Sequence, residues 1–278
     1  MLVVSAVVAT AAEAKTSPQP AGPDAALKAG WRAYQRGDLP EALKAYQEAV
    51  AASPQDASLW YDVGCLYALQ HESDRARDAF QHTLLLQPAF AAAHDALGQL
   101  DEQAQAFDKA LAAYQRAAEL EPTNSRFIRH LARIRLRLGD AAAGQEALRR
   151  LLELEPDDVD GRYQLGVLEL RAEMPDLAIN DFRKTVELAP NHIMAWNGLG
   201  LAYARIGAFD EARKALEKAN TLQPDRAETQ TNLGVIAAKQ QQWDEARRAW
   251  HRALELDQHF SPAMKNLEEL DQLTTPSP

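Results

Sequence analysis

A 34-residue period governs this sequence. Proline returns at that interval, at Pro54, Pro88, Pro122, Pro156, Pro190 and Pro224. A column of small residues keeps the same spacing, at Gly30, Gly64, Gly98, Ala132, Gly166, Gly200 and Gly234. A fixed period of about 20 to 50 residues is typical of a stacked repeat protein, in which each unit contacts only its neighbours. The chain is therefore expected to fold as a solenoid rather than around one central core.

Each period encodes two helices. Within residues 57–90, apolar and small side chains recur with the spacing of one helical face, at Trp60, Val63, Gly64 and Tyr67. Asp74 is then expected to cap a second helix whose apolar stripe includes Ala76 and Phe80, and Pro88 ends it. The small residues at 64 and 76 allow the two helices to approach closely. Since one such pair cannot bury its apolar face alone, the pairs must stack.

These residues resemble the tetratricopeptide repeat, whose pattern is W-x2-L-G-x2-Y, then A-x3-F, then P. Residues 193–226 carry it as Trp196, Leu199, Gly200, Tyr203, Ala212 and Pro224. Seven repeats follow in phase, at 23–56, 57–90, 91–124, 125–158, 159–192, 193–226 and 227–260. The resemblance implies an all-α, right-handed superhelical solenoid of antiparallel helix pairs. Repeat four departs most from the pattern, with Ala132 for Gly and Gly144 for Ala, and we expect a local bend there.

The two ends differ from the repeats. Residues 261–273 predict a final capping helix with an apolar edge at Met264, Leu267 and Leu270, and residues 274–278 predict a disordered tail. Residues 1–14 are apolar and end in an Ala-x-Ala sequence, which is typical of a signal peptide but lacks its positive n-region. They favour export to the periplasm over a cytoplasmic location, although an apolar tail stays an alternative. Residues 15–22 predict a Pro-rich linker.

Composition and motifs exclude several classes of function. The net charge of −10 disfavours nucleic acid as a partner. The single cysteine, Cys65, rules out a disulfide framework and a multi-cysteine zinc site. No apolar run reaches the roughly 20 residues of a membrane-spanning helix. The histidines lack metal-ligand spacing and no catalytic motif is present, so we expect a non-enzymatic protein without metal or cofactor.

The resemblance also implies where partners bind. In the tetratricopeptide family, the first helices of the repeats line a concave groove that holds peptides or protein segments. On this chain the groove positions of repeats one and two give an aromatic patch of Trp31, Tyr34 and Tyr61. Repeat four gives four guanidinium groups on one helical face, at Arg126, Arg129, Arg133 and Arg137. The last groove position continues as one cation per repeat, at Arg171, Arg205 and Lys239.

Two interpretations of these cations stay open. Asp95 and Glu102 of repeat three could pair with Arg129 and Arg133, leaving the others solvated. Alternatively, the row of cations binds an extended acidic segment, because arginine contacts carboxylates through two parallel hydrogen bonds. The leading hypothesis is a non-enzymatic scaffold that binds a protein or peptide, with an acidic segment, in its groove. The alternatives are a self-associating assembly protein and an accessory subunit of an enzyme or secretion complex.

Overall fold

The computed structural model describes residues 25–274, which contain helices and no strands. The first helices of the seven repeats are α2(Ala25–Gln35), α4(Ala57–Leu69), α6(Ala91–Gln103), α8(Ser125–Arg137), α10(Val159–Arg171), α12(Ile193–Arg205) and α14(Ala227–Lys239). The second helices are α3(Leu39–Ala52), α5(Ser73–Leu86), α7(Phe107–Leu120), α9(Ala141–Leu154), α11(Pro175–Leu188), α13(Phe209–Leu222) and α15(Trp243–Leu256). A final helix, α16(Ser261–Thr274), follows. The expected signal peptide and linker lie outside the described residues, as does the tail beyond Thr274.

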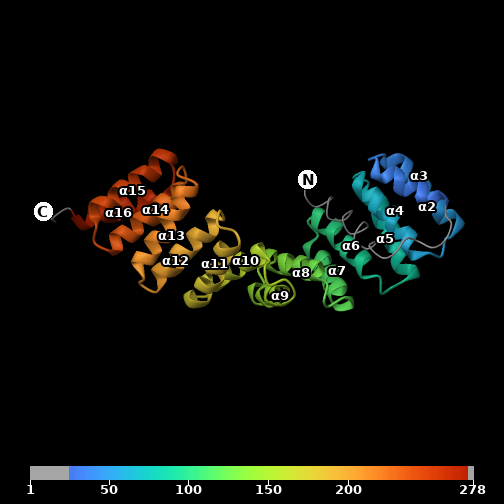
Figure 1. The fold of residues 1–278 in the computed structure, drawn as a ribbon, viewed down its shortest axis with the longest axis horizontal. Coiled ribbons are helices and arrows are strands. Elements are labelled where there is room, and N and C mark those ends of the chain that lie inside the picture. The colour runs from blue at the N-terminus through green and yellow to red at the C-terminus, as the bar shows by residue number, and fades with distance from the viewer. Residues whose placement is uncertain (1–24, 275–278) are drawn as a thin grey trace. The chain divides into compact units, whose positions relative to one another are not determined.

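The chain divides into two units, residues 1–147 and residues 148–278. The boundary falls inside α9, in repeat four, which is the repeat that departs most from the sequence pattern. In repeats one, two, three, five, six and seven, the first helix packs on its own second helix (Figure 1). The second helix packs on the next first helix from α3 to α8 in the first unit and from α11 to α14 in the second. Each unit is therefore an all-α solenoid of antiparallel helix pairs. None of the helices between residues 25 and 274 is long and apolar enough to span a bilayer.

Close helix packing explains the column of small residues. A Cβ atom at Gly64 would lie 2.5 Å from the ring of Phe80, and one at Gly98 would lie 2.7 Å from the ring of Tyr114. Both rings are fully buried, so neither can move aside. Glycine is required here because the aromatic ring of the second helix lies directly against the backbone of the first.

The repeated prolines have a second role besides ending a helix. Each of their carbonyl groups would be left without an intrahelical partner. The side chain six residues later contacts that carbonyl oxygen in four repeats. Trp60 Nε1 donates to Pro54 at 3.0 Å and Trp196 Nε1 to Pro190 at 2.8 Å. The equivalent contacts come from His94 Nε2 to Pro88 at 3.0 Å and from an Arg162 guanidinium to Pro156 at 2.6 Å.

The turn inside every repeat uses one residue with positive φ. These residues share one repeat position, and their φ angles lie between 57° and 83°: Gly37, His71, Gln105, Gly139, Glu173, Gly207 and Gln241. After this turn the second helix begins earlier than predicted, so the residue predicted to cap the helix lies inside it. In repeat two the N-cap is Glu72, which makes no side-chain cap hydrogen bond, and Asp74 lies in the first turn. Asp74 therefore complements the helix dipole instead of capping the helix.

Helix α16 covers the last repeat. Ala263, Leu267 and Leu270 are buried and pack against α15 and α14, in a cluster that includes Trp250. The expected apolar edge was wrong at one position, because Met264 is 43% exposed. Ala263 takes its place in the contact, where a smaller side chain allows α16 to lie close to the stack.

Candidate functional site

The predicted arginines of repeat four lie on α8, next to acidic residues of α6. Glu102 on α6 accepts a hydrogen bond from Arg133 at 2.6 Å and another from Arg137 at 3.3 Å. The hydroxyl of Tyr114 donates to the same carboxylate at 2.8 Å. The ion pair expected between Glu102 and Arg133 is therefore present, and Glu102 also holds Arg137, which the sequence analysis did not foresee.

Asp95 is the second acid beside α8 and is 1% exposed. Its carboxylate lies 2.6 Å from His130 Nδ1 and accepts a hydrogen bond from Gln99 at 2.8 Å. Arg126 Nε lies 3.8 Å away. One of the two interpretations of the sequence paired Asp95 with an arginine of repeat four, and neither included the buried contact with His130, which is a finding of the structure. Because a buried charge needs hydrogen bonds as well as an opposite charge, this network fixes α6 against α8.

Tyr114 interacts with both acidic groups, Glu102 and Asp95. Burial raises the pKa of its phenol well above the ordinary value, and the negative charges of Glu102 and Asp95 raise it further. The phenol therefore stays protonated and remains a hydrogen-bond donor to Glu102. Its ring also lies 5.1 Å from the ring of His130.

Arg133 and Arg137 remain partly exposed to solvent despite these contacts. The Arg133 and Arg137 side chains are 42% and 55% exposed, and the two guanidinium groups share the single carboxylate of Glu102. Arg137 also lies over the ring of Phe107, at 4.8 Å from its centre. One negative charge between two cations leaves this part of α8 positive towards solvent.

The predicted aromatic patch divides into an open part and a buried part. Trp31 and Tyr34 stack with ring centres 5.6 Å apart, and both are half-buried. Tyr61 is only 5% exposed and packs against Phe80 at 5.6 Å and Phe90 at 5.0 Å. Tyr61 is thus a core residue in this structure, because Phe90, the N-cap residue of α6, packs against its ring. Trp31 and Tyr34 remain available on α2.

The cations of the second unit lie in the last turns of three first helices. Arg171, Arg205 and Lys239 end α10, α12 and α14, and all three are exposed. These helices are neighbours, since α12 contacts both α10 and α14. Arg205 donates to Glu173 at 2.9 Å, whereas Arg171 and Lys239 form no ion pair within residues 25–274. Cations near a helix C-terminus are also favoured by the helix dipole.

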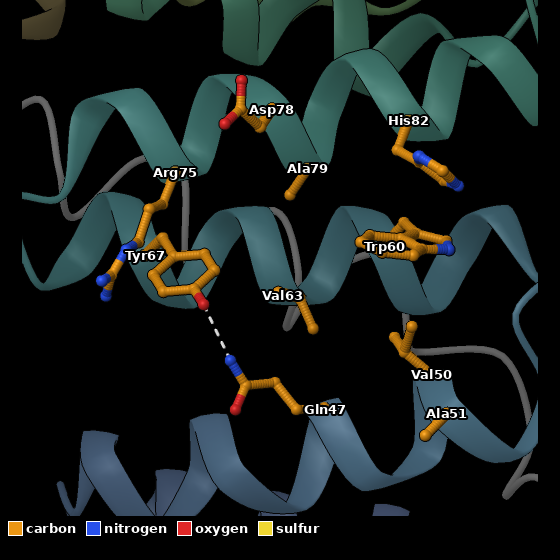
Figure 2. Close-up of a pocket in the computed structure, with 10 residues that line it drawn as sticks. All are labelled: Gln47, Val50, Ala51, Trp60, Val63, Tyr67, Arg75, Asp78, Ala79 and His82. Atoms are coloured by element: carbon orange, nitrogen blue, oxygen red, sulfur yellow. Dashed lines mark hydrogen bonds between the residues drawn. The ribbon is translucent and has the colours of Figure 1, made fainter.

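Two cavities of about 480 Å³ each were not predicted from the sequence. One lies among α3, α4 and α5, around Trp60 and Tyr67 (Figure 2). The other lies among α11, α12 and α13, around Trp196 and Tyr203. Each lining residue of the second cavity is the repeat equivalent of one in the first. A signal was available, because only repeats two and six carry both the Trp and the Tyr of the motif.

Within residues 25–274, no group of three or more His, Cys, Asp or Glu side chains is arranged to hold an ion. The buried His130 is already engaged by Asp95.

The geometry defines an α-solenoid with charged and aromatic surfaces on its first helices. Family models described as TPR repeat or tetratricopeptide repeat match residues 30–70, 102–166, 163–227 and 227–260. The chain belongs to the tetratricopeptide repeat family, which places it among protein-interaction scaffolds. Comparison with curated protein sequences gives no significant match.

Solved structures show the same fold at low sequence identity. YrrB, described as a TPR protein with an unusual peptide-binding site, is 24% identical with a TM-score of 0.63, covering 67% of this chain and 96% of YrrB. MamA from Desulfovibrio magneticus RS-1 is 21% identical with a TM-score of 0.58, covering 61% and 96%. Pseudomonas aeruginosa pilF is 16% identical with a TM-score of 0.60, covering 77% and 97%. These similarities concern the fold alone.

Proposed function

We propose that this protein is a non-enzymatic scaffold whose first helices hold an acidic segment of a partner protein. We call the surface formed by the first helices of each unit its first-helix face. In the first unit this face carries the half-buried Trp31 and Tyr34 on α2 and the arginines of α8. In the second unit it carries Arg171, Arg205 and Lys239. Family membership supports a protein or peptide as the ligand.

The observation that carries the proposal is the surplus of cations over carboxylates on this face. Glu102 serves two guanidinium groups, and both remain about half exposed. Arg171 and Lys239 have no ion pair within residues 25–274. Exposed arginines with free N–H groups can bind carboxylates through paired hydrogen bonds. One cation at the end of each successive first helix matches a ligand that runs across the helices.

The variant that tests this proposal should change only cations that make no ion pair within the protein. Replacing Arg133 by Glu would place a second carboxylate beside Glu102 and would disturb the fold as well as binding. Arg171→Glu combined with Lys239→Glu changes two exposed side chains that have no ion pair in the described part of the chain. The matched control is Lys109→Glu combined with Arg248→Glu, which makes the same charge change on the second helices α7 and α15.

The experiment is an affinity capture from an extract of the native organism with wild type, variant and control. We expect wild type and control to retain the same partner proteins, and the Arg171→Glu, Lys239→Glu variant to lose at least one of them. Circular dichroism should show that all three proteins stay fully helical, with a slightly lower melting temperature for the Arg171→Glu, Lys239→Glu variant because the helix dipole disfavours acids in the last turn of a helix. An identical set of captured proteins in all three samples would contradict the proposal.

A further inference from the structure

The cavity of the second unit has a preformed aromatic floor. Trp196 and Tyr203 on α12 are half-buried, and Val186 and Leu199 complete the apolar surface between them. The indole of Trp196 is held in place because its Nε1 donates to the carbonyl of Pro190 at 2.8 Å. A rigid, partly exposed indole beside a phenol ring is the kind of surface that anchors an apolar side chain of a partner.

The equivalent cavity of the first unit is different because its own side chains cover the floor (Figure 2). The ring of His82 lies 4.0 Å from that of Trp60. The guanidinium of Arg75 lies 5.7 Å from the centre of the Tyr67 ring, and Gln47 donates to the Tyr67 hydroxyl at 2.7 Å. The aromatic side chains of this cavity are therefore already in contact with side chains of repeats one and two.

In the second unit, the corresponding positions hold charged residues that leave the floor open. His82 is replaced by Lys218, Arg75 by Glu211 and Gln47 by Arg183. None of these three side chains contacts Trp196 or Tyr203 through a ring, cation–π or hydrogen-bond interaction among the described residues. The aromatic floor therefore remains available to a ligand.

The rim of this open cavity is positively charged. Arg183, Lys214 and Lys218 are exposed and make no ion pair within residues 25–274. The rim also contains two acids, but Glu187 lies 3.4 Å from Lys184 and is thus neutralised by a lysine outside the cavity. Glu211 remains as the single uncompensated acid. The excess of positive charge favours a ligand with negative charges beside its apolar anchor.

This cavity contains none of the residues that carry the proposed function of the first-helix face, although both include side chains of α12. Trp196, Leu199 and Tyr203 follow one side of α12, whereas Arg205 lies on the other side, roughly 160° away around the helix axis. The cavity is completed by the second helices α11 and α13, which carry its charged rim.

We propose that the cavity around Trp196 is a second docking site, which binds a partner segment with one large apolar side chain flanked by Asp or Glu. The apolar side chain lies on Trp196 and Tyr203. The flanking carboxylates contact Lys214, Lys218 and Arg183. The proposal does not depend on the function of the first-helix face, because the two surfaces share no residue.

The test is a titration followed by nuclear magnetic resonance of the indole N–H groups. The chain has five tryptophans, so it gives five signals, and a Trp196→Phe variant assigns the signal of interest. The probe is a short synthetic peptide with one central Phe flanked by Asp and Glu. We expect it to shift the Trp196 signal and to leave the Trp60 signal in place, because His82 already covers Trp60.

Charge variants make the test specific. Lys214→Glu combined with Lys218→Glu should weaken binding by about tenfold, since each exposed ion pair contributes up to about 1 kcal/mol. The control, Lys44→Glu combined with Lys109→Glu, makes the same charge change on α3 and α7 and should bind as wild type does. A peptide with Lys in place of Asp and Glu should not shift the Trp196 signal.

Three results would overturn the proposal. The first is a Trp196 signal that does not move up to millimolar peptide. The second is an equal shift with the Lys-flanked peptide, which would make the cavity a non-selective apolar surface. The third is a Trp196 shift that depends on protein concentration without peptide, which would assign the cavity to a second copy of this chain.

Discussion

The carboxylate of Glu102 on α6 lies 2.6 Å from the guanidinium of Arg133 on α8 and accepts a hydrogen bond from Arg137 as well. This contact joins the first helices of two successive repeats. It also occupies part of the cationic surface that a ligand would use. Glu102 therefore acts as an internal competitor for any acidic partner of α8.

Removing that competitor should strengthen binding while it weakens the fold. In Glu102→Gln, two guanidinium groups lose their shared carboxylate, and the free energy of unfolding should fall by about 1–2 kcal/mol. The affinity for an acidic peptide that contacts α8 should rise several-fold, as measured by fluorescence anisotropy. The control is Glu119→Gln, which breaks an exposed pair with Arg116. If Glu102→Gln lowers stability without raising affinity, the arginines of α8 are structural.

The left-handed turn residues offer a stabilising change. Gln105 has a φ of 59°, a conformation that glycine adopts without the steric cost that other residues incur. Gln105→Gly should raise the free energy of unfolding by about 0.5–1 kcal/mol, measured by urea denaturation. The reverse change, Gly207→Ala, should lower it by a similar amount. Equal stabilities in all three proteins would show that this turn carries no strain.

The contact between Gly64 and Phe80 predicts a destabilising change with a specific rescue. Gly64→Ala introduces a Cβ atom 2.5 Å from the buried Phe80 ring, which should cost about 1–3 kcal/mol of stability. Phe80→Leu in the same chain should recover part of the loss, because repeat four carries Ala132 and Leu148 at these two positions. Urea denaturation of the single and double variants measures the coupling. Additive losses would show that the two residues do not compete for space.

Glu169 predicts a pH dependence of the second unit. The pKa of its carboxyl is raised from 4.5 to about 7, first by burial and then by the neighbouring Asp181, while Arg149 opposes the shift. The folded state therefore holds a proton that the unfolded state has released above pH 4.5. Stability should fall as the pH rises through this range, by up to about 3 kcal/mol between pH 4.5 and 7.

The measurement compares the wild type with Glu169→Gln at pH 5 and pH 8. The stability of the wild type relative to this variant should fall between the two values, because the glutamine side chain does not titrate. Glu153→Gln on α9 is the control, since Glu153 is exposed. A stability difference that stays constant from pH 5 to pH 8 would mean that Glu169 titrates as an ordinary carboxyl.

The repeat period predicted the helices because each column of residues has one structural role in every repeat. It predicted the close approach of the two helices at Gly64, and it predicted that the second helices end near the repeated prolines, which follow the last helical residue by two positions. The period could not predict contacts that depend on side chains outside the motif. Tyr61 is buried because Phe90 happens to cover it, and Asp95 is engaged by His130, which no repeat position requires.

The difference between the two cavities also depends on side chains that the repeat motif does not specify. Trp60 and Trp196 occupy one repeat position, yet His82 covers the first and Lys218 leaves the second open. The motif alone indicates an aromatic floor in both repeats. The side chain at the tenth position of the second helix, His82 in α5 and Lys218 in α13, decides whether the aromatic floor is available. Only the structure shows that the His82 ring lies against Trp60.

A fluorescence anisotropy titration can show whether the first-helix face binds an acidic segment. The probe is a labelled peptide of Asp and Glu residues, with a Lys and Arg peptide as its counterpart. We expect the wild type to bind only the acidic peptide, and we expect Arg171→Glu combined with Lys239→Glu to weaken binding about tenfold. Lys109→Glu with Arg248→Glu should leave it unchanged. Equal affinity of all three proteins for the acidic peptide would show that the cations of the first-helix face do not bind it.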